Sequence, residues 1–238
     1  MLTKDVAYQV DGKSFTGYLA DDDTRGPARP GILVCHQGGG LTEHAKERAR
    51  MLAELGYVAF ALDMYGEAVT GMEHAMRLLR GLMQDPPLMR ARAHAALDLL
   101  KAQPNVDPNR LAAVGYCFGG AVVLEIARSR SDVAAVVAFH PGMTELPDSD
   151  DRKIACKLMV CAGANDPLIP PEAREKFIRL MNACGADWQF LTYGNASHSF
   201  TDKSVDALNM KGFSYHAPTD QRSWAAMRDL FDEAMGKM

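Results

Sequence analysis

The sequence has few of the features that mark specialised classes of protein. Its longest uninterrupted apolar run, residues 133–139, is far shorter than a bilayer span. The first residues lack a charged segment followed by an apolar stretch, so we expect no secretory signal. A net charge of −4, from 26 Lys and Arg against 30 Asp and Glu, gives no basic excess for nucleic acid. We therefore expect neither a membrane nor a nucleic acid among the partners of this protein.

The cysteines are too few and too scattered for a structural framework. There are five, an odd number, and no Cys-x-x-Cys pair occurs. A zinc site or a set of disulfides is therefore a poor interpretation, and we expect no metal. Unpaired thiols fit a reducing compartment, so we expect a cytoplasmic protein. Four of the five fit small buried hydrophobic residues, which leaves one that could carry chemistry.

What the 238 residues do contain is an alternation of apolar strands and amphipathic helices. Two short runs joined at Asp11-Gly12 predict a β-hairpin at the start of the chain. The later strands are apolar throughout, as expected for a parallel sheet covered on both faces. The predicted strands are residues 31–35, 57–62, 111–114, 133–139, 158–162 and 188–193, and the predicted helices are residues 42–55, 71–84, 89–100, 119–128, 173–184 and 218–234. We predict one α/β domain over residues 1–238, with helices on both faces of a mostly parallel sheet.

The most informative segment joins a strand to a helix and reads Gly115-Tyr116-Cys117-Phe118-Gly119. Gly-x-Cys-x-Gly is the nucleophile-elbow pattern of the α/β-hydrolase fold, with Cys in place of Ser. Glycines flank the nucleophile because the strained turn brings the strand and helix backbones close together. A cysteine at a helix N-terminus meets amide dipoles that favour the thiolate. The alternative is a glycine-rich junction that holds an inert buried cysteine.

Two further residues follow Cys117 in the order nucleophile, acid, base. Asp166 comes just after the predicted strand 158–162, and His198 lies in the loop after strand 188–193. The carboxyl ends of parallel strands meet at one edge of a sheet, where such folds bind ligands. We predict that His198 takes the proton of Cys117 and that Asp166 orients the imidazole. Taken singly, Asp166 could be a turn residue and His198 a surface histidine.

A glycine-rich segment after the strand 31–35 predicts an oxyanion hole. It reads Cys35-His36-Gln37-Gly38-Gly39-Gly40, and small residues there let the backbone approach a substrate oxygen. We predict that the amides of Gly38 and Phe118 are the two donors. A phosphate-binding loop is the competing interpretation, but neither Gly-x-Gly-x-x-Gly nor Gly-Lys-Ser/Thr occurs here.

These motifs resemble those of the dienelactone hydrolase family, a branch of the α/β-hydrolases. The resemblance extends from about residue 14 to residue 231. It rests on residues 115–120, on Asp63-Met64-Tyr65-Gly66, on residues 163–166 and on residues 198–200. It implies a Cys-Asp-His triad and hydrolysis of an ester or lactone without a cofactor. Archetypal members open the enol-lactone ring of dienelactones.

The sequence departs from that family at two positions. The family commonly has Glu where this sequence has Gln37, and an Arg that binds the substrate carboxylate where this sequence has Asp202. Gln37 can hydrogen-bond a thiol but cannot take its proton, so activation should depend on His198. Asp202 would repel an anion, so we expect a substrate other than the usual dienelactone, unless Arg77 or Arg80 compensates.

Other residues of the same loops are weaker candidates for the substrate pocket. They are Tyr65, His140 and Ser199, and the first two could equally serve packing or a turn. A second functional hypothesis is a hydrolase-fold protein that binds or senses a small lactone with little turnover. The sequence leaves open whether the protein is a monomer or a homodimer.

Overall fold

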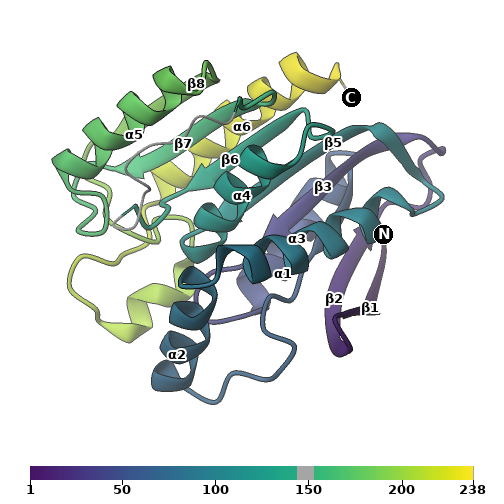
Figure 1. Cartoon of the computed structure of the whole chain (residues 1–238), viewed down its shortest axis with the longest axis horizontal. Coiled ribbons are helices and arrows are strands. Elements are labelled where there is room, and N and C mark those ends of the chain that lie inside the picture. Colours follow the sequence, from purple (N-terminus) through teal and green to yellow (C-terminus); the bar gives the residue numbers. More distant parts are fainter. Residues whose placement is uncertain (144–152, 238) are drawn as a thin grey trace.

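The centre of the molecule is one eight-stranded sheet (Figure 1). The computed structural model describes residues 1–143 and 153–237. The strand order is β1-β2-β4-β3-β5-β6-β7-β8. The strands are β1 (Leu2–Val10), β2 (Lys13–Asp21), β3 (Arg29–Cys35), β4 (Val58–Ala61), β5 (Val106–Tyr116), β6 (Ala135–Phe139), β7 (Lys157–Gly163) and β8 (Asp187–Tyr193). Strands β1, β2 and β4 pair antiparallel, and all pairings from β4 to β8 are parallel, so the predicted mostly parallel sheet is confirmed.

The predicted hairpin forms the antiparallel edge of the sheet. Val10 pairs with Lys13 across the turn, and Asp11 and Gly12 both have positive φ, 49° and 79°. Two consecutive positive φ angles define the turn that matches the twist of a β-hairpin, which explains the Asp-Gly pair.

Helices cover both faces of the sheet, as predicted. They are α1 (Glu43–Glu54), α2 (Met72–Met83), α3 (Pro86–Lys101), α4 (Phe118–Ser129), α5 (Pro171–Ala183) and α6 (Ala217–Met235), together with a 3₁₀ helix, η1 (Lys203–Leu208). Helices α3, α4 and α5 contribute to the hydrophobic cluster on one face, and α1 and α6 to the cluster on the other. Within the described part of the chain, none of the helices is both long enough and apolar enough to cross a bilayer.

The parallel strands place the candidate residues at one edge of the sheet. Six consecutive parallel strands end in the same direction, so the segments after them lie next to one another. These segments contain His36, Asp63, Cys117, His140, Asp166 and His198. Helix α2 and the yellow-green segment with η1 lie on this side of the molecule in Figure 1.

Candidate active site

Cys117 lies on a strained turn between β5 and α4. Its φ of 55° and ψ of −113° are unusual for a residue with a side chain. The flanking glycines are required sterically. A side-chain carbon added at Gly115 would lie 1.9 Å from the carbonyl oxygen of Gly119, and one added at Gly119 would lie 2.1 Å from the carbonyl oxygen of Cys35. Cys117 is also the one cysteine of the five that is not fully buried. The turn therefore presents a single thiol at the edge of the sheet.

The structure brings Asp166 and His198 together in front of this thiol. The Nδ1 atom of His198 lies 2.9 Å from Oδ2 of Asp166, and both side chains are fully shielded from solvent. The other carboxylate oxygen of Asp166 accepts a hydrogen bond of 2.8 Å from the amide of Leu168. The Nε2 atom of His198 has no partner apart from the Cys117 thiol. Cys117, His198 and Asp166 therefore form a continuous line from sulfur to carboxylate.

Their mutual electrostatics favour an ion pair. Burial alone would raise the pKa of the Cys117 thiol, but the charge and hydrogen bond of His198 and the amides of Gly38 and Phe118 outweigh it, and the pKa is lowered. Burial alone would lower the pKa of His198, but the facing Cys117 and the hydrogen bond to Asp166 raise it. A lowered thiol pKa beside a raised imidazole pKa favours the pair of thiolate and imidazolium over the neutral pair.

The amides of Gly38 and Phe118 converge on the sulfur of Cys117 from two different elements. Phe118 begins α4, so its amide is one of the unpaired donors of a helix N-terminus. Gly38 lies on the loop after β3, where side chains are small and helix α2 packs against the backbone. An added carbon at Gly38 would lie 2.9 Å from Cδ1 of Leu79 on that helix.

Hydrogen bonds to both neighbouring carbonyl groups fix the direction of the Gly38 amide. The carbonyl oxygen of Gln37 lies 2.6 Å from Nδ1 of His36 and accepts a bond of 3.1 Å from the amide of Gly40. The Nε2 atom of His36 accepts a bond of 3.1 Å from the amide of Met64, so Nδ1 is the donor. The carbonyl of Gly38 accepts the Tyr65 hydroxyl at 2.9 Å. Because both carbonyls are held away from Cys117, the amide between them points toward it.

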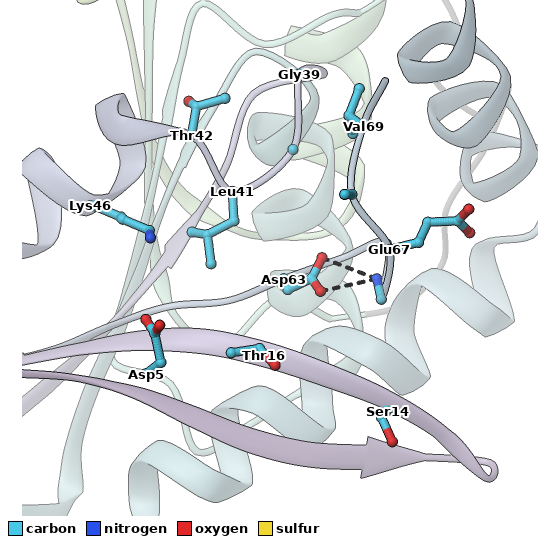
Figure 2. Close-up of a pocket in the computed structure, with 13 residues that line it drawn as sticks. Asp5, Ser14, Thr16, Gly39, Leu41, Thr42, Lys46, Asp63, Glu67 and Val69 are labelled. Atoms are coloured by element: carbon cyan, nitrogen blue, oxygen red, sulfur yellow. Dashed lines mark hydrogen bonds between the residues drawn. The ribbon is translucent and has the colours of Figure 1, made fainter. Parts of the chain in front are cut away.

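Asp63 orients Tyr65 through a tight turn. Its carboxylate accepts hydrogen bonds from the amides of Tyr65 and Gly66, and Figure 2 shows the bonds to Gly66. The same turn borders a cavity of about 540 Å³ between the hairpin, the Gly39–Gly40 backbone and residues 66–69 (Figure 2). Neither Cys117 nor His198 lines this cavity. Tyr65 is 1% exposed and bonds to Gly38, so it holds the loop of residues 36–40 instead of facing an open pocket. We call this segment the oxyanion loop, after the oxyanion hole that the sequence predicts there.

Gln37 and Asp202, the two departures from the family pattern, contact each other. The Nε2 atom of Gln37 donates to Oδ2 of Asp202 at 2.7 Å, and the hydroxyl of Ser199 donates to Oε1 of Gln37 at 3.2 Å. Asp202 also caps η1 by accepting the amide of Ser204 at 2.8 Å. Gln37 is therefore bonded to the loop of His198, and its carboxamide is not directed at Cys117.

The two arginines on α2, Arg77 and Arg80, are exposed, and neither contacts Asp202 among the described residues. Leu79 faces the oxyanion loop, and Arg77, two residues earlier, projects about 160° around the helix from it. The exception left open by the sequence, compensation of Asp202 by one of these arginines, is therefore not supported by a contact among the described residues.

His140 packs against the ring of His198. It is fully buried, and its Nε2 lies 2.8 Å from the hydroxyl oxygen of Thr201. Its ring contacts that of His198 edge to face, with the two ring centroids 5.1 Å apart. The ring of Phe213 also contacts that of His198 edge to face, with the ring centroids 4.8 Å apart. The contact of Phe213 with His198 and the role of His36 are not among the features predicted from the sequence. A histidine between a buried strand and the glycine run, two residues before Gly38, was a usable signal for His36, whereas nothing in the sequence linked Phe213 to His198.

No group of three or more His, Cys, Asp or Glu side chains in residues 1–143 and 153–237 is arranged to hold a metal ion. The fold and the elbow define an α/β-hydrolase with a cysteine at the nucleophile position. Comparison with known proteins agrees: residues 15–235 match the model of the dienelactone hydrolase family. The chain belongs to the dienelactone hydrolase family, and it is an enzyme of the ester and lactone hydrolase class.

Individual relatives cover nearly the whole chain. A dienelactone hydrolase-like promiscuous phosphotriesterase, P91 from metagenomic libraries, is 40% identical with a TM-score of 0.93, and 99% of each chain is covered. The protein in the structure called m3DLH shares 45% sequence identity with this chain, with a TM-score of 0.93 and 98% of each chain covered. A Yersinia pestis relative named "Putative carboxymethylenebutenolidase" is 24% identical over 93% of this chain and 85% of its own length.

Proposed function

We propose that this protein hydrolyses uncharged esters or lactones through a thioester on Cys117. The observation that carries the proposal is the alignment of the Cys117 thiol, His198 and Asp166 beneath the amides of Gly38 and Phe118. A nucleophile, an oriented base and two backbone donors are the groups that acyl transfer requires.

The reaction has two halves. The Cys117 thiolate attacks the carbonyl carbon, and the developing oxyanion accepts the Gly38 and Phe118 amides. The bond to the leaving oxygen breaks, and the proton on His198 passes to that oxygen. In the second half, His198 takes a proton from water, the resulting hydroxide attacks the thioester, and the acid is released as the thiolate re-forms. Asp166 stabilises the imidazolium in both halves.

The charges around the site support an uncharged substrate. Asp202 is joined to the oxyanion loop, its pKa is lowered in spite of burial by hydrogen bonds from Ser204, and it stays ionised at neutral pH. Arg77 projects away from the loop, and among the described residues neither Arg77 nor Arg80 forms an ion pair with Asp202. A carboxylate next to the scissile bond would therefore meet a like charge and no compensating cation.

The surface of α2 supports a partly apolar substrate. Met72, Met76 and Leu79 follow one another at helical spacing, so they share the face that contacts Gly38. Met72 is 55% exposed and Met76 is 36% exposed. Flexible methionines beside the oxyanion loop suit apolar groups of varied shape.

Replacing Cys117 tests the proposal. We expect p-nitrophenyl acetate hydrolysis by Cys117→Ala to fall to the uncatalysed rate while circular dichroism and the melting temperature stay close to those of the wild type. Cys156→Ala is the matched control because Cys156 is buried away from the triad. Undiminished turnover by Cys117→Ala would refute the proposal.

A substrate screen tests the charge preference. It pairs neutral and anionic lactones of similar size, and it includes an uncharged phosphotriester because a 40% identical relative is described as a phosphotriesterase. We expect faster turnover of the neutral member of each pair. Tight lactone binding without steady-state turnover would instead support the function of a sensor.

A further inference from the structure

Two separate loops carry the parts of the proposed active site. The loop after β3 carries the Gly38 amide, and the loop after β8 carries His198. Each loop is anchored within its own surroundings: His36 and Tyr65 hold the first, and Gly212 and Ser214 bond the backbone of His198 in the second. A separate contact is needed to fix one loop relative to the other.

The Gln37 side chain makes that contact. It donates to Asp202 at 2.7 Å and accepts from Ser199 at 3.2 Å, and both partners lie within four residues of His198. Gln37 immediately precedes the oxyanion donor Gly38. Asp202 is fixed in turn by the amide and hydroxyl of Ser204, at 2.8 and 2.7 Å. We call the Gln37–Asp202 bond, with its Ser199 contact, the loop clamp.

The clamp cannot form between two ionised carboxylates, so at most one of its two partners can be acidic. A glutamate at position 37 would bring two carboxylates to the distance of a hydrogen bond, where like charges oppose each other. The other groups near Asp202 do not supply a compensating cation at this point. His44 on α1 is neutral because burial lowers its pKa to about 4, Arg48 is engaged with Thr201 and Asp220, and Lys203 lies over the ring of Tyr215.

We propose that Gln37 and Asp202 act as a matched pair of positioning residues that fix the oxyanion loop against the loop of the catalytic base. The two departures from the family pattern are then linked: because residue 202 is acidic, residue 37 has to be neutral for the clamp to form. This inference rests on the proposed function, since it concerns how that same site is held in its reactive geometry. Its consequence is that each substitution has an effect that depends on the other.

A double-mutant cycle that exchanges the carboxylate and the amide between the two positions tests this dependence. In Asp202→Asn the clamp can persist, because Gln37 can rotate its carboxamide to accept from the new amide and donate to Ser199. We expect a loss of about threefold in kcat for p-nitrophenyl acetate. In Gln37→Glu we expect a loss of about thirtyfold at pH 8, with little change in KM. The double variant Gln37→Glu/Asp202→Asn restores a carboxylate–amide bond, and we expect kcat within about threefold of the wild type.

Two readouts separate positioning from a general structural defect. Alkylation of Cys117 by iodoacetamide needs no oxyanion hole, so it should change much less than ester turnover in Gln37→Glu. The activity of Gln37→Glu relative to the wild type should also fall as pH rises, because at low pH the two carboxyls share a proton and the clamp is restored. Asp23→Asn, in the loop at the opposite edge of the sheet, is the matched control with unchanged activity.

Each outcome decides the inference. Rescue by the double variant supports the clamp, and additive losses in the double variant overturn it. If Gln37→Glu does not fold, Asp202→Ala replaces it, and an equal loss of alkylation and ester turnover in that variant also overturns the clamp. Retained esterase activity in Cys117→Ala would contradict the proposed function. If Cys117→Ala is inactive but the double variant shows additive losses, only the clamp is contradicted.

Discussion

Asp166→Asn tests how the base is oriented. Oδ1 of Asp166 is held by the amide of Leu168 at 2.8 Å, so the carbonyl oxygen of the asparagine takes that position. Its NH₂ group then faces Nδ1 of His198, 2.9 Å away, and donates to it. The imidazole must carry its proton on Nε2, the atom that faces Cys117, so it can no longer accept one there.

The magnitude follows from the same geometry. The imidazolium loses its carboxylate and the base has the wrong tautomer, which in triads of this kind lowers turnover by about 10⁴, or about 5.5 kcal/mol. The assay is kcat/KM for p-nitrophenyl acetate, with the melting temperature measured beside it. Asp187→Asn, a substitution at an exposed ion pair with Lys157, is the control. A loss of less than tenfold in Asp166→Asn with an unchanged fold would refute the reasoning.

Three further outcomes are expected. Iodoacetamide alkylation of Cys117 should rise with pH through a midpoint below 9.0. His198→Asn should move the midpoint upward, because His198 no longer lowers the thiol pKa and only the amides of Gly38 and Phe118 oppose the effect of burial; an unmoved midpoint would contradict the ion pair. Gly119→Ala, whose new carbon would lie 2.1 Å from a carbonyl oxygen, should lower the free energy of unfolding in urea by about 3 kcal/mol. Tyr65→Phe should lower kcat about tenfold with KM nearly constant, since the Gly38 carbonyl loses its anchor; a change in KM alone would indicate a substrate contact instead.

The strand–turn–helix at Cys117 was predictable because the crowding around it leaves a compact motif in the sequence. An added carbon at Gly115 would lie 1.9 Å from the carbonyl oxygen of Gly119, and one at Gly119 would lie 2.1 Å from that of Cys35 on the neighbouring strand β3, so both positions demand glycine. The placement of Asp166 and His198 was predictable for a related reason. Each follows a parallel strand, and the topology brings all such segments to one edge.

Side-chain pairing between distant loops was not predictable. The bond from Gln37 to Asp202 spans 165 positions, and no local sequence pattern connects the two residues. The direction of Arg77 depends on how α2 rotates against the oxyanion loop, which packing at Leu79 decides. Helix η1 is too short for a periodic pattern, so the segment that carries Asp202 had no predicted structure.

The most direct test of the central claim is mass spectrometry of the protein quenched during turnover of p-nitrophenyl acetate. The account predicts an acetyl group on the peptide that contains Cys117, absent in Cys117→Ala and released on further incubation. Acetylation confined to another residue, or steady turnover without any acylated Cys117 at early times, would contradict it.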